Sequence, residues 1–242
     1  MSIDLRNADC YQEIKTLSPN SIQLIYFNPP FGITGNEWDV SLDYSKLWDE
    51  FWRVLKPRGC VLIHCSGKFT IEVMNSQLKY FRYRWFWDKH FKTGHLRAKF
   101  QPMRKIEEIC VFYKKAPTYN PQMVPNVKPY HRKFNKPTHN NTGYYGSRTT
   151  HFTHENTYDK AYPTHLIKFN RRRHKYSTRP DDLCDYIINT YTNEGDFVLD
   201  ITMSDAQTGK SCLKLNRHYI GFEINTDRYN DAVKNTNRQI EI

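Results

Sequence analysis

A rigid polar turn follows a short β-forming run near the start of the chain. The run Ile22–Phe27 leads directly into Asn28-Pro29-Pro30-Phe31. Because two prolines cannot continue a central strand, we expect the strand to end here. The Asn28 side-chain oxygen and the Pro29 carbonyl, fixed by the stiff prolines, could accept the N–H bonds of an exocyclic amine and turn its lone pair toward an incoming methyl group. Phe31 offers a flat face for a base taken out of its stack. A plain Pro-Pro turn is the alternative interpretation.

Three carboxylates occupy positions near the ends of expected strands, where they could bind a nucleoside. Asp200 ends one β-rich run, and Glu223 ends a later one. A carboxylate at the end of a strand, after a βαβ step, suits the two hydroxyls of a ribose. Asp9, which follows Asn7 and Ala8, could bind an adenine edge. Each also has a structural alternative: Asp200 could cap the next helix, Glu223 could be a surface acid, and Asp9 could form a turn.

The positive charge of the chain is concentrated in one segment. The formal net charge is +11, and residues 116–180 hold twelve Lys/Arg but only two acids. Such a local excess predicts contact with a polyanion, and the interleaved Tyr, Phe and His favour a nucleic acid over a merely solvated basic loop. The candidate nucleic-acid-binding residues are Lys133, Arg148, Arg171, Arg172 and Arg173.

Strand and helix patterns alternate on both sides of this segment. Such alternation predicts an α/β fold with a mainly parallel sheet. Periodicity is lost from 116 to 165, where an inserted recognition lobe explains the length better than a linker. The expected strands lie near 22–27, 60–65, 80–88, 107–114, 195–200 and 219–223, and the expected helices near 47–55, 68–78, 180–191 and from Thr226 onward.

Composition narrows the class of protein. A chain of 242 residues with 38% hydrophobic residues can bury one core, or one core plus a lobe. It has no apolar run long enough for a membrane span and no signal-like N-terminus, so we expect a cytoplasmic protein. The six cysteines include no Cys-x-x-Cys pair. We therefore expect reduced thiols and no metal site.

Longer stretches of the chain resemble a known family. They include "NADCYQEIKTLSPNSIQLIYFNPPFGIT", "FWRVLKPRGCVLIH" and "NEGDFVLDITMSDAQTGKSCLKLNRHYIGFEIN". These stretches are similar to the circularly permuted adenine N6 and cytosine N4 DNA methyltransferases, the beta group common in phages and restriction–modification systems. In that family the catalytic turn comes first, the target-recognition region second and the cofactor loop last, and this chain has the same order.

The resemblance implies a fold and an activity. The fold is α/β, a Rossmann-like class I S-adenosylmethionine-dependent methyltransferase with an inserted target-recognition lobe. The implied reaction is methyl transfer from S-adenosylmethionine to adenine N6 in double-stranded DNA, without a metal. A homodimer or a partner subunit is compatible with this activity. The chain would divide into a catalytic half, 1–115, a basic target-recognition region, 116–174, and a cofactor-binding half, 175–242.

The resemblance also assigns residues to roles. Asn28, Pro29, Pro30 and Phe31 become the catalytic turn. The family usually begins this turn with Asp and ends it with Tyr, but the Asn28 carbonyl oxygen accepts the same hydrogen bond. The implied cofactor-binding residues are Asp9, Ser177, Arg179, Asp200, Ser204 and Glu223.

The cofactor loop departs most from the family. The family loop reads Asp-Pro-Phe-x-Gly-Ser-Gly-Thr-Thr; here Ser204 and Ala206 replace both glycines, and Asp205 replaces the serine. Glycine permits unusual backbone angles and close approach of a cofactor, and Asp205 would add a carboxylate near that of the cofactor. We therefore expect weak cofactor binding. The alternative function is a degenerate methyltransferase homologue that binds DNA or a partner without catalysis, and a second alternative is an enzyme that acts on RNA.

Overall fold

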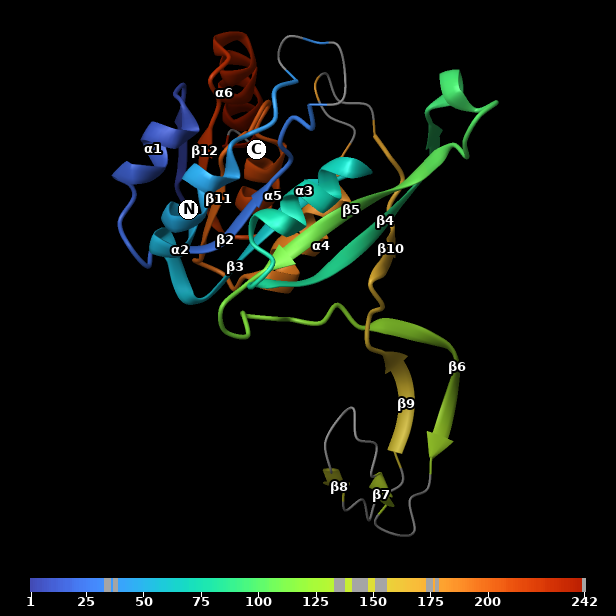
Figure 1. Ribbon diagram of the computed structural model, residues 1–242. Helices are drawn as coiled ribbons and strands as arrows, with labels where there is room; N and C mark the ends of the chain where they lie inside the picture. Colours follow the sequence, from blue (N-terminus) through green and yellow to red (C-terminus); the bar gives the residue numbers. More distant parts are fainter. Residues whose placement is uncertain are drawn as a thin grey trace. The chain divides into compact units, whose positions relative to one another are not determined.

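The chain forms two compact units in the computed structural model. The main unit comprises residues 1–120 and 164–242, and the second comprises residues 121–163 (Figure 1). The residues that the structure describes are 1–32, 36, 39–132, 138–140, 148–150, 156–172, 176 and 179–240.

A sheet with eight described strands forms the centre of the main unit. Its order is β1-β12-β11-β2-β3-β5-β4-β10. Each neighbouring pair is parallel except the two that involve β5. All its other described strands therefore point the same way, and their carboxyl ends meet at one edge. The strands are β1 (Ile3–Arg6), β2 (Ile22–Phe27), β3 (Leu55–Cys65), β4 (Phe81–Thr93), β5 (Arg104–Phe112), β10 (Leu166–Lys168), β11 (Phe197–Asp200) and β12 (His218–Phe222).

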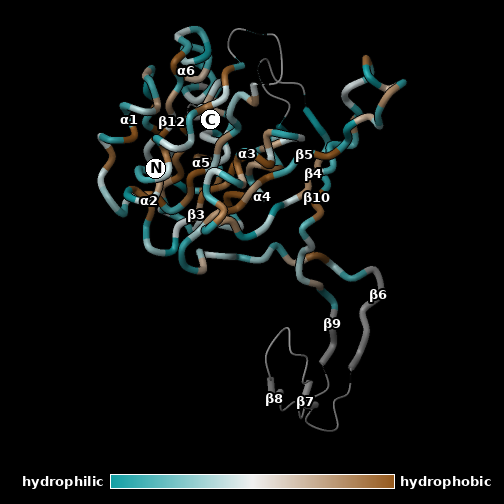
Figure 2. Tube along the Cα trace, in the orientation of Figure 1, coloured by the Kyte–Doolittle hydropathy of each residue, from teal (hydrophilic) through white to brown (hydrophobic). Residues whose placement is uncertain are grey.

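Helices cover both faces of this sheet because its central strands are apolar on both sides. Ile25 and Phe27 of β2 pack in one cluster with residues of α1, α2 and α3, whereas Leu24 and Tyr26 pack in another with residues of α4, α5 and α6. Figure 2 shows these apolar stretches in brown within the main unit. The helices are α1 (Cys10–Thr16), α2 (Trp48–Val54), α3 (Lys68–Ser76), α4 (Asp181–Tyr191), α5 (Gln207–Lys214) and α6 (Thr226–Ile240).

The structure confirms the long periodic elements and adds short ones. The strand at 22–27, the helix that follows Pro180 and the helix from Thr226 begin where the sequence predicts. The helix expected at 47–55 ends at Val54, and the following Lys-Pro-Arg-Gly segment belongs to β3 instead of forming a loop. The short elements β1, α1 and β10 were not predicted.

The limits of the insertion differ from the predicted 116–174. Residues 116–120 belong to the main unit, and so does the chain from Thr164 onward. The chain after Thr164 belongs to the main unit because β10 pairs in parallel with β4, with Ile167 opposite Trp87. Ile167 is buried against the main core. The insertion is therefore shorter, at 121–163.

The second unit contains antiparallel pairs of strands. β6 (Val124–Arg132) pairs with β9 (Asn156–Ala161), and β7 (Thr138–Asn140) pairs with β8 (Arg148–Thr150). The segment without sequence periodicity is thus built on a two-stranded ribbon. Residues 121–163 thus form a compact unit of their own, and the role of this unit in target recognition stays a prediction.

Three further findings bear on the class of protein. No helix within the described ranges is long and apolar enough to cross a membrane. All six cysteines are free and buried, and burial raises the pKa of the Cys184 thiol to about 11, so it stays protonated. The described part of the chain holds no cluster of three or more His, Cys, Asp or Glu that could bind a metal ion.

Candidate active site

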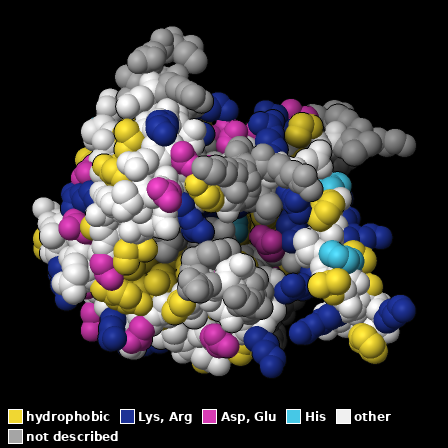
Figure 3. Space-filling model, turned by 90° about the horizontal axis from the view of Figure 1, so that it is seen from above, with side chains coloured by type: hydrophobic (Ala, Val, Ile, Leu, Met, Phe, Trp, Pro, Cys, Tyr) yellow, Lys and Arg dark blue, Asp and Glu magenta, His cyan; other side chains and the backbone are white. Residues whose placement is uncertain are grey.

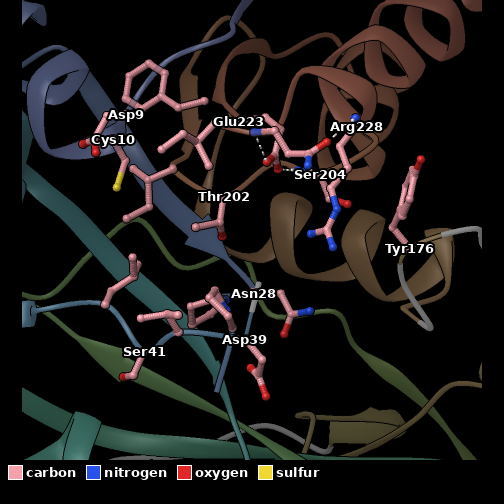
Figure 4. A pocket seen from close by; sticks show the side chains of 18 of the residues that line it. Asp9, Cys10, Asn28, Asp39, Ser41, Tyr176, Thr202, Ser204, Glu223 and Arg228 are labelled. Carbon is pink, nitrogen blue, oxygen red and sulfur yellow. Dashed lines mark hydrogen bonds between the residues drawn. The ribbon is translucent and has the colours of Figure 1, made fainter. Parts of the chain in front are cut away.

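A pocket of about 660 Å³ opens at the carboxyl edge of the sheet. Its walls come from the segments that follow β2, β11 and β12, which are neighbours in the sheet. Ligands of open α/β sheets bind at this edge, outside the carboxyl ends of the strands. In the view of Figure 4, Asn28 and Asp39 lie on one side, Glu223, Ser204 and Arg228 on the other, and Thr202 between them.

The predicted catalytic turn lines this pocket. Asn28, Pro29, Pro30 and Phe31 all contribute to the wall. Pro29 is buried, which fixes its carbonyl, while Asn28 is half-buried. No other described residue forms a hydrogen bond with the Asn28 side chain, so its amide oxygen can accept a bond from a ligand. The turn thus brings two acceptors to the pocket, and their catalytic role stays a prediction.

Asp39 holds the end of this turn and was missed in the sequence. Its Oδ1 accepts a hydrogen bond of 2.9 Å from the Gly32 backbone N–H. The side chain is only 7% exposed and lines the pocket. Asp39 stands in a segment with no periodic pattern, so nothing in the sequence linked it to the turn seven residues earlier.

The Phe31 ring packs differently from the expectation. It stacks on Phe69 of α3, with the ring centroids 4.9 Å apart and the planes inclined by 24°. One face of the ring is therefore covered by the core. Phe31 still lines the pocket. A flipped base could therefore contact only the part of the ring that Phe69 leaves uncovered.

Glu223 fastens the cofactor loop to the end of β12. Its Oε2 accepts a 3.0 Å hydrogen bond from the Ser204 N–H, and its Oε1 accepts a 2.8 Å bond from the Asn225 N–H. Both bonds are shown dashed in Figure 4. Each carboxylate oxygen keeps a further lone pair, and Glu223 lines the pocket. The geometry therefore fits the predicted role of a ribose ligand, with a second role in shaping the loop.

The loop keeps its glycine-like backbone although both glycines are absent. Ser204 has φ of 53° and Ala206 has φ of 55°. Ala206 is the N-cap of α5 and is buried in the apolar cluster, away from the pocket wall. Left-handed angles cost a residue with a Cβ roughly 1–2 kcal/mol. Strain of this kind persists at functional sites when the surrounding structure enforces it.

Two acids of this region lie elsewhere than predicted. Asp200 is fully buried behind the loop and does not line the pocket. Its carboxylate accepts hydrogen bonds from the Thr202 N–H and the Thr208 hydroxyl, and burial raises its pKa to about 6. Asp205 is buried too and is not on the pocket wall. Asp200 thus supports the loop, and neither acid lines the pocket.

Arg179 lies between the pocket and the buried core. It is 3% exposed, lines the pocket, and stands 4.0 Å from Asp200. Its guanidinium lies 5.6 Å from the centroid of the Tyr26 ring, and the Tyr26 hydroxyl bonds to His64 Nε2 at 2.8 Å. Burial lowers the pKa of His64 well below its usual range. The imidazole is neutral at pH 7, so His64 serves here as a buried hydrogen-bond partner.

The N-terminal segment closes the pocket from the other side. Asp9 lines the wall, and its side chain also caps α1 by accepting a 2.7 Å bond from the Tyr11 N–H. Asn7 donates to the Glu223 carbonyl at 2.8 Å. The predicted adenine-binding segment and the predicted ribose ligand are thus directly joined. Tyr176 and Arg228 line the pocket at the opposite end from Asp9 in Figure 4, and no sequence pattern pointed to them.

The predicted nucleic-acid contacts are only partly within the described residues. Lys133 and Arg173 lie outside them, and Arg148 belongs to β8 of the second unit. Ser177, which was predicted to bind the cofactor, also lies outside the described residues. Arg171 and Arg172 belong to the main unit and not to the insertion. Arg172 lies 3.6 Å from Asp181.

Relieving the strain at Ser204 should stabilise the protein. We expect Ser204→Gly to raise the melting temperature by about 2–4 °C, which corresponds to roughly 1 kcal/mol. Ala206→Gly should change it little, because the relief is offset by the loss of a buried methyl group worth about 0.8 kcal/mol. Gly195→Ala is the converse control: Gly195 has φ of 78° and open space around it, so this variant should be less stable. Calorimetric melting checks all three, and a lower melting temperature for Ser204→Gly would contradict the strain.

Comparison with known proteins agrees with this geometry. A family model described as DNA methylase matches residues 22–234. The chain is similar to the type II methyltransferase M.HpaI of Haemophilus parainfluenzae, with 27% identity over 236 residues that cover 91% of this chain and 69% of M.HpaI. It is also similar to M.BamHI of Bacillus amyloliquefaciens, with 27% identity over 256 residues, which cover 97% of this chain but only 57% of M.BamHI.

Solved structures show the same fold. The chain matches the cytosine-N4-specific PvuII DNA methyltransferase with a TM-score of 0.67 and 14% identity, covering 96% of this chain and 86% of that one. It matches M1.HpyAVI in complex with S-adenosylmethionine with a TM-score of 0.61 and 21% identity, covering 96% and 99%. These matches confirm the Rossmann-like methyltransferase fold expected from the sequence.

Proposed function

The chain belongs to the DNA methylase family, and from that premise we propose that it transfers a methyl group from S-adenosylmethionine to the N6 amino group of adenine in double-stranded DNA. The observation that carries the proposal is that the predicted catalytic turn and the predicted cofactor loop line the same pocket. The acceptors of Asn28 and Pro29 line one part, and the loop bound to Glu223 lines another.

The pocket suits the family's S-adenosylmethionine. Its volume lies within the roughly 300–1,000 Å³ usual for small-molecule sites. The Glu223 carboxylate has lone pairs left for the ribose hydroxyls, and Phe222 and Ile224 on either side of it give the wall apolar surface for an adenine ring. When bound, this cofactor supplies an activated methyl group.

The residues of the turn prepare the amine. The lone pair of an exocyclic amine is conjugated into the base, which makes it a poor nucleophile. Hydrogen bonds from its two N–H groups to Asn28 Oδ1 and to the Pro29 carbonyl would hold the nitrogen so that the lone pair points into the pocket. Burial of Pro29 and the bond from the Gly32 N–H to Asp39 restrict the backbone of the turn, which supports a preorganised Pro29 carbonyl beside the Asn28 side chain.

Two observations favour an enzyme over a degenerate homologue. The loop keeps the positive φ angles at Ser204 and Ala206 despite their cost, and Asp205 does not line the pocket. Adenine is proposed over cytosine because the resembling phage-type forms act mostly on adenine. Duplex DNA is proposed because the matching family model is that of DNA methylases.

Mass spectrometry of methylated nucleosides tests the proposal. The purified chain is incubated with S-adenosylmethionine carrying a deuterated methyl group and with unmethylated genomic DNA, or with total RNA in a parallel reaction. We expect labelled N6-methyladenine in the DNA digest. Labelled N4-methylcytosine would contradict the choice of base alone, label in RNA only would contradict the choice of nucleic acid, and no label in either would favour the degenerate homologue.

A further inference from the structure

A basic hairpin outside the insertion projects from the main unit. It consists of residues 89–105, from the end of β4 through the 3₁₀ turn His95–Arg97 to the start of β5, and is called the 89–105 hairpin below. It holds six Lys/Arg and no Asp or Glu. The sequence interpretation missed it because residues 1–88 are neutral, with ten basic and ten acidic residues, and the acids of residues 181–242 offset the charge of the hairpin when everything outside 116–180 is counted together.

The hairpin extends beyond the edge of the sheet that holds the pocket. β5 pairs with β3 so that Cys65, the last residue of β3, lies opposite Glu108. Residues before Glu108 therefore run past the carboxyl edge, where Asn28 follows β2. At about 3.4 Å per residue, the four steps back to Arg104 alone carry the chain roughly 14 Å beyond that edge. Figure 1 shows the hairpin as an arm beyond the ends of β4 and β5.

The positive charges nearest the tip have no partners within the described part of the chain. Lys89 and Lys105, at the base, pair with Glu107 and Asp88 at 2.7 and 3.0 Å. By contrast, the structure gives no ion pair, hydrogen bond or ring contact to the side chains of four exposed residues closer to the tip. These are Lys92, Arg97, Lys99 and Arg104. Unpaired cations at the edge of the sheet that holds the pocket are complementary to phosphates.

The same tip carries two solvent-exposed apolar side chains. Leu96 is 87% exposed and Phe100 is 88% exposed, the highest values among the large hydrophobic residues that the structure describes. Figure 3, which looks down on this edge, shows hydrophobic and basic side chains side by side on the projecting part. Apolar side chains on a basic surface are used by DNA-binding proteins as wedges between base steps.

Arg171 extends the basic surface of the hairpin. Its backbone N–H donates to the Lys89 carbonyl at 3.3 Å, and its guanidinium lies 4.2 Å from the centroid of the Phe91 ring. The stack fixes Arg171 on the side of the arm. Its predicted DNA contact therefore belongs with the hairpin and not with the insertion.

We propose that the 89–105 hairpin binds duplex DNA beside the target base, with its free cations on phosphates and with Leu96 and Phe100 as a wedge that fills the gap in the stack left by the flipped base. The inference rests on the proposed function, because only an enzyme that takes a base out of a duplex leaves such a gap. The occupant is DNA because the tip combines unpaired cations with apolar side chains at the edge that holds the pocket.

Two double variants separate the two roles, and both change exposed residues. Binding is measured with a short labelled duplex and with the same duplex carrying a central abasic site, which offers a ready-made gap. We expect the wild-type protein to bind the abasic duplex about tenfold more tightly, because the unstacking cost is removed. Leu96→Ser/Phe100→Ser should lose this preference and keep the dependence on salt. Arg97→Ala/Lys99→Ala should keep the preference and flatten the log–log salt slope by about 0.9 for each phosphate that is no longer neutralised.

A matched control changes charge at the opposite edge of the sheet. Lys79 precedes β4 and Lys115 follows β5, and both are exposed. Lys79→Ala/Lys115→Ala should bind both duplexes as the wild type does. Hairpin variants that do the same would overturn the inference and leave the proposed function intact. A change in oligomeric state without a change in DNA binding would identify the tip as a contact between copies and overturn it too. Wild-type protein that binds neither duplex would contradict the proposed function as well.

Discussion

Asn28→Ala should lower the turnover number for DNA methylation by about 100- to 1,000-fold, the usual loss when one preorganised group at a reacting centre is removed. The side chain lines the pocket, and no described residue competes for its oxygen. Without it, the amine would be held by the Pro29 carbonyl alone, and its lone pair would stay conjugated with the base. The measurement is single-turnover methylation of DNA by the purified variant.

The conservative variant separates chemistry from folding. Asn28→Asp keeps an acceptor oxygen at the same place and introduces the residue that the family usually has there, so its turnover should stay within about tenfold of the wild type. Cofactor affinity, measured by isothermal titration, should be unchanged in both variants because Asn28 lies across the pocket from Glu223 (Figure 4). Equal losses of cofactor affinity and turnover in Asn28→Ala would show that the site is wrongly assigned.

The parts of the site that the sequence predicted are those where a strand ends. The apolar run of β2 followed by two prolines placed Asn28, and the run of β12 placed Glu223, because the carboxyl ends of parallel strands meet at one edge. Contacts between distant segments could not be predicted in this way. The stack of Phe31 on Phe69 joins a turn to a helix 38 residues later, and no spacing rule connects them.

The sequence also could not predict which residues of the cofactor loop line the pocket. The order of residues places Asp205 between Ser204 and Ala206, which both have left-handed φ angles, but Asp205 is buried and does not line the pocket. Asp205 therefore adds no carboxylate to the pocket wall, where a repulsion of about 1 kcal/mol at 4 Å in water was expected. Ala206 is likewise off the wall. Of the three altered positions, Ser204 alone faces the pocket.

The cost of the altered loop therefore falls on folding more than on binding. The strain at Ser204 and Ala206 is present before a ligand arrives, since both φ angles are already positive in the free protein. One extra Cβ in the pocket, at Ser204, can weaken binding by a factor of about ten if it costs about 1.4 kcal/mol. We accordingly expect cofactor affinity closer to that of the family than the sequence alone indicated.

Glu223→Ala should have the largest effect on cofactor affinity, a loss of about 100- to 10,000-fold. Hydrogen bonds to a charged group are worth about 1.5–3 kcal/mol each, and a ribose offers two hydroxyls to this carboxylate. The variant also leaves the Ser204 and Asn225 N–H groups without their acceptor, so the loop loses its attachment to β12. Glu223→Gln, which keeps one acceptor oxygen, should lose less, and Glu194→Ala, an exposed acid at the amino end of β11, should lose nothing. Isothermal titration with S-adenosylmethionine measures all three, and wild-type affinity in Glu223→Ala would exclude the carboxylate as the ribose ligand.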